Sequence, residues 1–193
     1  MTATVDARPY PWPYDGGLTP DRLALVIAGA QPAWARRSVG ADTTAAVIGK
    51  VAAAVRGGGG WVVHVRHTGS GASPSGLPPT PAFPEEWALS DDPAPEDLVV
   101  DATGVDGFSG SALDRELRCR GIDTLVLCGY GAEAAVSSTL RSANDRGYEC
   151  LTLTDASAPF DADLGAHNLS SITMSGGIFG AIASSEALLE ALQ

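Results

Sequence analysis

Two histidines and an arginine stand together near the end of one apolar segment. His64, Arg66 and His67 belong to the run Trp-Val-Val-His-Val-Arg-His that begins at residue 61. Imidazole exchanges protons near neutral pH, and a guanidinium binds carboxylates. The segment 61–66 is rich in β-branched residues and is expected to form a strand, whose carboxyl end is where parallel sheets bind ligands. We therefore take the histidines as candidate acid/base groups and the arginine as a candidate ligand contact. The alternatives are a hydrogen-bonded core histidine and an ion-pair anchor.

A turn that leads into a helix is the second candidate. Tyr130, Gly131 and Ala132 join the apolar strand expected at 124–128 to the helix expected at 133–146. The first N–H groups of a helix have no partner inside it and can bind an anion or a carbonyl oxygen. Glycine also permits unusual backbone angles at this point. We therefore expect the turn to contact a ligand.

Short apolar runs alternate with longer amphipathic segments along the chain. This pattern predicts an α/β fold with three layers, in which helices flank a six-stranded, mostly parallel, Rossmann-like sheet. A length of 193 residues fits a single domain that spans 1–193. The expected strands are 23–27, 61–66, 98–101, 124–128, 149–154 and 179–183, and the expected helices are 43–56, 111–120, 133–146, 164–174 and 185–192.

One connection is much longer than the others. The segment 68–97 is dense in Pro, Gly and Ser, and a connection of this length in a compact domain is usually functional or disordered. Because it follows the carboxyl end of a strand, we expect it to lie over the pocket. Trp87 within it is a candidate ligand contact, with simple packing as the alternative. Trp34, beyond the first expected strand, is a candidate aromatic wall of the pocket.

Composition argues against several classes of protein. The net charge is −11 with only 12 Lys and Arg, which disfavours binding to nucleic acid or to an anionic membrane. No apolar run reaches the length of a membrane-spanning helix, and the first residues do not resemble a secretory signal, so we expect a cytoplasmic protein. The few histidines and cysteines lack metal-ligand spacing, so neither a metal nor another cofactor is expected. The cysteines, at positions 119, 128 and 150, are expected to be reduced structural residues.

Several segments carry a family pattern that runs through nearly the whole chain. They are Pro9–Gly16, Leu23–Ile27 with Gln31, Gly107-Phe108 ahead of Leu113-Asp114, Arg120–Gly129, Ala143–Cys150, Asp155-Ala156 and Gly176–Ala181. In this order they resemble the isochorismatase-like cysteine hydrolases, particularly the branch with biuret and ureidoacrylate amidohydrolases. The resemblance implies the fold of that family and assembly into dimers or tetramers.

The resemblance also marks three departures from the family. Members carry an aspartate two residues before Gln31, a lysine after the third strand and a nucleophilic cysteine near the start of the helix after the central strand. The matching positions here hold Gly29, Ala102 and Ala135. In the family the thiolate attacks a carbonyl, the carboxylate moves protons and the lysine lowers the thiol pKa. Small residues at all three positions predict a larger, more apolar pocket without this chemistry.

Two further roles follow from the resemblance. Asp106 stands just before Gly107-Phe108, in a loop that faces the active site of the family, and is a third candidate acid/base group. Its alternative is an exposed loop carboxylate. The turn at Gly131 corresponds to the family's oxyanion hole, whose backbone donors are independent of the missing side chains.

Three functions are therefore open. The first is a repurposed pocket that binds a small organic molecule and promotes a non-covalent acid/base step, such as elimination or cyclisation. The Ala- and Gly-rich composition associates it with specialised metabolism. The second is a non-catalytic subunit, as a homo-oligomer or a hetero-oligomer with an active paralogue. The third is a divergent hydrolase that acts on a C–N bond.

Overall fold

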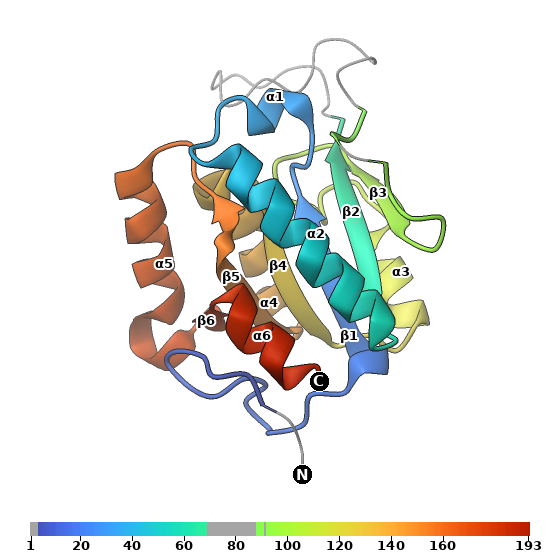
Figure 1. Cartoon of the computed structure of the whole chain (residues 1–193), viewed down its shortest axis with the longest axis vertical. Helices are drawn as coiled ribbons and strands as arrows, with labels where there is room; N and C mark the ends of the chain where they lie inside the picture. Colours follow the sequence, from blue (N-terminus) through green and yellow to red (C-terminus); the bar gives the residue numbers. More distant parts are fainter. Residues whose placement is uncertain (1–3, 69–87, 91) are drawn as a thin grey trace.

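A single six-stranded sheet forms the centre of the protein (Figure 1). The structure is a computed structural model that describes residues 4–68, 88–90 and 92–193. The strand order is β3-β2-β1-β4-β5-β6, and every neighbouring pair is parallel. The six-stranded, mostly parallel sheet predicted from the sequence is thus confirmed. The strands are β1 (Leu23–Ala28), β2 (Trp61–His67), β3 (Leu98–Ala102), β4 (Thr124–Tyr130), β5 (Glu149–Ala158) and β6 (Ala181–Ala183).

Helices cover both faces of the sheet, as the alternating pattern predicts. In Figure 1, α2 and α6 lie in front of the sheet, α3 and α4 lie behind it, and α5 stands beside its β6 edge. Because both faces are covered, every residue of β1 and β4 is buried. The helices are α1 (Pro32–Ala35), α2 (Ala41–Gly57), α3 (Leu113–Cys119), α4 (Ser137–Asp145), α5 (Ala162–Gly177) and α6 (Ser185–Ala191), with a 3₁₀ turn η1 (Pro20–Arg22) and a π-helical turn η3 (Ala132–Val136).

Two elements differ from the sequence-based expectation. The helix expected at 133–146 is divided into η3 and α4. The strand expected to end at 154 continues to Ala158, through a register shift against β4. The intervening Asp155 is polar and suggests a loop, but its carboxylate accepts hydrogen bonds from Ser185 at the start of α6 (2.8 Å from the backbone N–H and 2.6 Å from the hydroxyl). This contact holds the strand in place.

The chain path places a topological switch point, where a crevice is expected, at the carboxyl ends of β1 and β4. From β1 the chain builds β2 and β3 on one side, and then returns to place β4 on the other side of β1. The connections that leave β1 and β4 therefore diverge, which is where open α/β sheets bind ligands. Among the described residues, no helix combines the length and the apolar character needed to cross a bilayer. Trp87 and most of the segment 68–97 lie outside the described residues.

Candidate functional site

The three small residues singled out by the family pattern lie at the carboxyl edge of the sheet, where the crevice is expected. Gly29 follows β1, Ala102 ends β3 and Ala135 lies in η3, and both alanines are fully buried. Gly29 has a left-handed φ of +69°, and a Cβ added there would lie 2.9 Å from the backbone oxygen of Tyr130. Residues with a side chain rarely adopt this backbone conformation. The backbone at position 29 is therefore unsuited to the aspartate that the family carries.

Two aromatic rings occupy the space beside the glycines. Trp34 stacks on Phe160 with ring centroids 5.6 Å apart. A Cβ on Gly29 would contact the Trp34 ring at 3.4 Å, and a Cβ on Gly131 would meet Trp34 at 2.9 Å and Phe160 at 2.7 Å. The sequence alone predicts an enlarged cavity here. The rings instead take up the room beside both glycines.

His67 is held firmly within this cluster. Its backbone N–H donates to Oε1 of Gln31 (2.8 Å), and Nε2 of Gln31 donates to its carbonyl oxygen (3.2 Å). Its ring atom Nδ1 lies 2.8 Å from the carbonyl oxygen of Gly104. A carbonyl oxygen can only accept, so Nδ1 carries the hydrogen and Nε2 presents a lone pair. Burial lowers the pKa of His67 and favours this neutral form.

Two buried polar atoms of the cluster have no hydrogen-bond partner among the described residues. They are Nε2 of His67 and Nε1 of Trp34, in side chains whose residues are each 2% exposed. The two rings lie 5.2 Å apart between centroids. One atom is an acceptor and the other a donor. An unmade buried hydrogen bond costs about 1–3 kcal/mol, so the cluster has unused binding capacity for a polar group.

His64 and Arg66 are separated from this cluster. Successive side chains of a strand point to opposite faces, so both lie on the face of β2 opposite His67. Nε2 of His64 lies 2.9 Å from the buried carboxylate of Asp97, which also binds Arg56 at 2.7 Å. Burial acts to raise the pKa of Asp97, but the hydrogen bonds from Arg56 and His64 outweigh it and lower that pKa.

Arg66 and Asp106 are both engaged in structural contacts. Arg66 forms a two-point ion pair with Asp101 on the neighbouring strand, at 2.6 and 3.0 Å. The Asp106 carboxylate accepts from the backbone N–H of Phe108 (2.9 Å) and from the hydroxyl of Ser142 (2.6 Å). The Arg66 ion pair matches its structural alternative, whereas Asp106 is a half-buried, hydrogen-bonded carboxylate and not the exposed one of its alternative. Their roles toward a ligand stay predictions.

The predicted oxyanion turn is also tied to its surroundings. The N–H of Gly131 donates to the Ser38 hydroxyl (3.2 Å), and the carbonyl of Ala132 accepts from Asn168 of α5 (3.2 Å). Tyr130 is buried at the end of β4. The carboxylate of Glu133 accepts the backbone N–H groups of Phe160 and Asp161. The turn, α5 and the aromatic cluster thus form one connected unit.

The sequence analysis predicted Trp34, His67 and the turn 130–132 as parts of one pocket. It did not predict that Gln31 hydrogen-bonds to the backbone of His67 or that Phe160 stacks on Trp34. Gln31 was noted only as a family marker, because its burial and its bonds to His67 are visible only in the structure. Phe160 was missed because β5 was ended too early. A strand extended to Ala158 places Phe160 at the carboxyl edge of the sheet.

Comparison with known proteins places this chain in a family. A family model described as the isochorismatase domain matches residues 23–187. The chain belongs to the isochorismatase family. The streptothricin hydrolase of Streptomyces noursei is 30% identical over 141 residues, which cover 72% of this chain and 50% of that protein. The chain therefore spans about half the length of that relative.

Other isochorismatase-family relatives cover more of the chain. The ureidoacrylate amidohydrolase RutB of Methylorubrum extorquens is 31% identical over 189 residues, covering 79% of this chain and 75% of that protein. A cysteine hydrolase from Pseudomonas syringae pv. phaseolicola 1448A superposes with a TM-score of 0.81 at 22% identity, over 91% of this chain and 94% of that one. The similarity of structure shows that the fold is shared.

The cysteines of this isochorismatase-family chain are poorly suited to nucleophilic attack. Cys128 and Cys150 are buried inside strands, and burial raises the pKa of each thiol well above its ordinary value. Cys119 is exposed at the end of α3. That helix runs back from the carboxyl edge, so its end lies near the amino ends of the strands, away from the crevice. In the described part of the chain, no cluster of side chains is suited to a metal ion.

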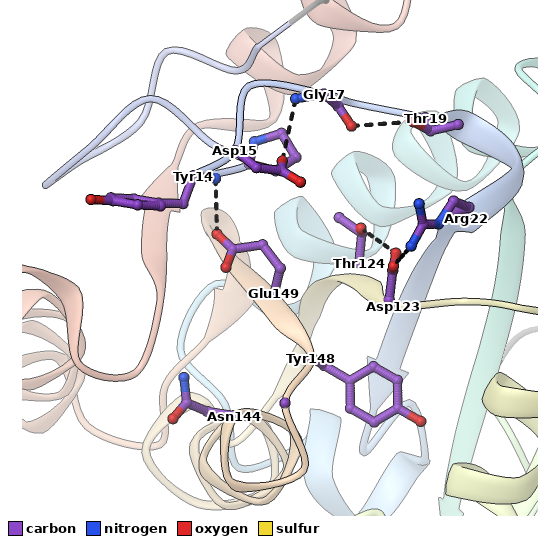
Figure 2. Close-up of a pocket in the computed structure, with 12 residues that line it drawn as sticks. Tyr14, Asp15, Gly17, Thr19, Arg22, Asp123, Thr124, Asn144, Tyr148 and Glu149 are labelled. Carbon is purple, nitrogen blue, oxygen red and sulfur yellow. Dashed lines mark hydrogen bonds and ion pairs between the residues drawn. The ribbon is translucent and has the colours of Figure 1, made fainter.

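A cavity of about 390 Å³ lies at the opposite end of the sheet (Figure 2). Its polar groups are largely satisfied by one another. Glu149 accepts the N–H of Tyr14 at 3.2 Å, and Asp123 is ion-paired with Arg22 and bound by Thr124. This cavity adjoins the amino ends of β4 and β5, not the crevice of the family site.

Proposed function

We propose that this isochorismatase-family protein binds a small organic molecule at the aromatic cluster and acts on it without a covalent thioester. The observation that carries the proposal is that His67 Nε2 and Trp34 Nε1 have no partner in the part of the chain that the structure describes. A bound group that both donates and accepts a hydrogen bond would satisfy the pair. The relatives' names point to hydrolysis, but this chain has Gly29, Ala102 and Ala135 at the positions where the family pattern places its reacting side chains.

The chemistry available to the pair is proton transfer. A neutral His67 can accept a proton at Nε2 from a carbon next to a bound carbonyl, while the N–H of Trp34 donates to the oxygen on which charge develops. In an elimination the electron pair of the broken C–H bond forms a double bond. A leaving group on the next carbon then departs with its own electron pair and takes up the proton. No thiol takes part in this sequence.

Binding can be tested with a panel of lactams, ureas and hydroxyketones, scored by the rise in unfolding temperature. We expect compounds that stabilise the wild type to lose their effect in the variants His67→Phe and Trp34→Phe, which remove the acceptor and the donor. Trp61→Phe is the matched control, because Trp61 packs under Arg120 on the protein surface. Equal stabilisation of wild type and both site variants would contradict the proposal.

Catalysis needs a separate measurement. Ureidoacrylate and streptothricin, the substrates named for the relatives, should release no ammonia or ring-opened product when incubated with the purified protein. Release that stops after thiol alkylation would instead support the third function, a divergent cysteine hydrolase. Labelling of Cys128 during turnover would assign the nucleophile.

A second candidate function is a non-catalytic subunit. The rings of Trp34 and Phe160 packed against Gly29 and Gly131 favour it, because they reduce the room for a substrate. Co-expression with an active paralogue followed by size analysis tests this candidate. A stable mixed complex, together with no stabilising compound in the binding screen, would favour it over the first function.

A further inference from the structure

No strand within residues 4–68, 88–90 and 92–193 pairs with the outer edge of β3, and a groove lies beside that edge. β3 ends the sheet order, and Figure 1 shows no described strand beyond it. A groove of about 320 Å³ separates β3 from the segment that leads into α3. Its lining residues are Leu98, Val99, Val100, Asp101, Gly110, Ser111, Ala112, Arg115 and Glu116. An added strand lies about 4.8 Å from its neighbour, a distance that brings it to this groove.

The backbone direction of β3 fixes which groups face outward. The carbonyl of Ala102 accepts from Thr68 on the β2 side, and hydrogen-bonding directions alternate along a strand. Leu98 and Val100 therefore also bond toward β2, whereas Val99 and Asp101 direct their N–H and C=O groups out of the sheet. No described residue hydrogen-bonds with these four backbone groups. Such groups are a template for another strand.

The edge lacks two of the usual features that protect against pairing, lysine and proline. Val99 is 45% exposed, and the strand Leu-Val-Val-Asp-Ala contains neither lysine nor proline. The charges around it are balanced in pairs, Asp101 with Arg66 and Glu116 with Arg115. On a chain of net charge −11, two copies can approach here without opposing like charges. This balance favours a second copy over a highly charged partner.

We propose that β3 pairs antiparallel with β3 of a second copy, which makes one continuous twelve-stranded sheet. All four outward backbone groups form hydrogen bonds only if the two-fold axis of the strand pair passes through Val100. Val99 then exchanges both backbone hydrogen bonds with Asp101 of the second copy, and Asp101 does so with Val99. The two Val100 residues face each other as a non-hydrogen-bonded pair on the axis. The contact is isologous, as closed dimers require.

The mass of the protein in solution tests whether the β3 edge forms a dimer. We expect the wild type to sediment at about twice the chain mass of 19.7 kDa. Val99→Pro removes one outward donor and no β2–β3 hydrogen bond, and Val99→Lys adds a charge to the edge. Both variants should sediment as monomers. Val39→Lys is the matched control, since Val39 is also exposed but lies before α2, and it should leave the dimer intact.

Cross-linking tests the register. Paired residues on non-hydrogen-bonded sites of antiparallel strands have Cα atoms about 4.5 Å apart, within the range of a disulfide. In a Cys119→Ser background, Val100→Cys should cross-link two chains under oxidation, and Val39→Cys should not. A monomeric wild type, a dimer that persists unchanged in both Val99 variants, or no cross-link at position 100 would overturn the proposal. A monomeric wild type would overturn the proposal even if its β3 edge bound an extended peptide of another protein.

Discussion

Replacing Gly29 by alanine should destabilise the fold even though only one methyl group is added. The position has a φ of +69°, and the new Cβ would stand 2.9 Å from the backbone oxygen of Tyr130. A left-handed backbone costs a residue with a side chain about 1–3 kcal/mol. The contact adds to this cost because a backbone oxygen cannot rotate away as a side chain would. We expect a total loss of about 2–4 kcal/mol.

The assay is equilibrium unfolding in urea together with the thermal midpoint, which should fall by about 5–15 °C for a chain of this size. Gly40→Ala separates the two causes, since Gly40 has a φ of +74° but nothing within 4 Å of its added Cβ. Gly40→Ala should lose only the stability that the left-handed backbone costs. If Gly29→Ala is no less stable than Gly40→Ala, the crowding argument is refuted.

Three further predictions concern groups outside the aromatic cluster. In the native protein a thiol reagent should label only Cys119, because Cys128 and Cys150 are buried. After unfolding it should label all three thiols. Rapid labelling of two thiols in the native protein would contradict this prediction. Asp97→Asn should cost about 3 kcal/mol in urea unfolding, since it leaves the Arg56 guanidinium without its carboxylate. Because the folded pKa of Asp97 is lowered, its contribution is complete above about pH 5 and is lost as the pH falls through the folded pKa, so wild type and variant should converge in acid. Glu133→Ala should cost about 1–3 kcal/mol and change the tryptophan emission, because it releases the backbone of Phe160; Glu133→Gln, which keeps an acceptor, should lose less.

The arrangement of strands and helices could be predicted from local patterns. Runs such as Leu23–Ala28 and Thr124–Tyr130 are apolar throughout because both of their faces are covered. The predicted end of a helix or strand was wrong where a tertiary contact extends that element. The strand that ends at Ala158 is an example, because it passes through a polar stretch fixed by Ser185 of a distant helix.

The candidate site could be predicted only in part. His64 and His67 were grouped together because they are close in sequence, but an offset of three residues puts them on opposite faces of a strand. Which face borders the crevice depends on the packing of α2 and α4, so the choice between them needed the fold. The role of Phe160 depended likewise on contacts with Trp34 and Glu133, which lie far from it in the sequence.

The sequence by itself determined the family, the parallel α/β sheet and the small residues at positions 29, 102 and 135, because these depend on residue identity and local periodicity. Only the tertiary structure decided that aromatic rings fill the space beside Gly29 and that His67 and Trp34 keep unused hydrogen-bonding atoms. It also decided that no described strand pairs with the outer edge of β3. Each of these features depends on which segments, distant in the sequence, pack against one another. The hydrophobic pattern of a sequence limits the possible packing arrangements but does not specify one of them.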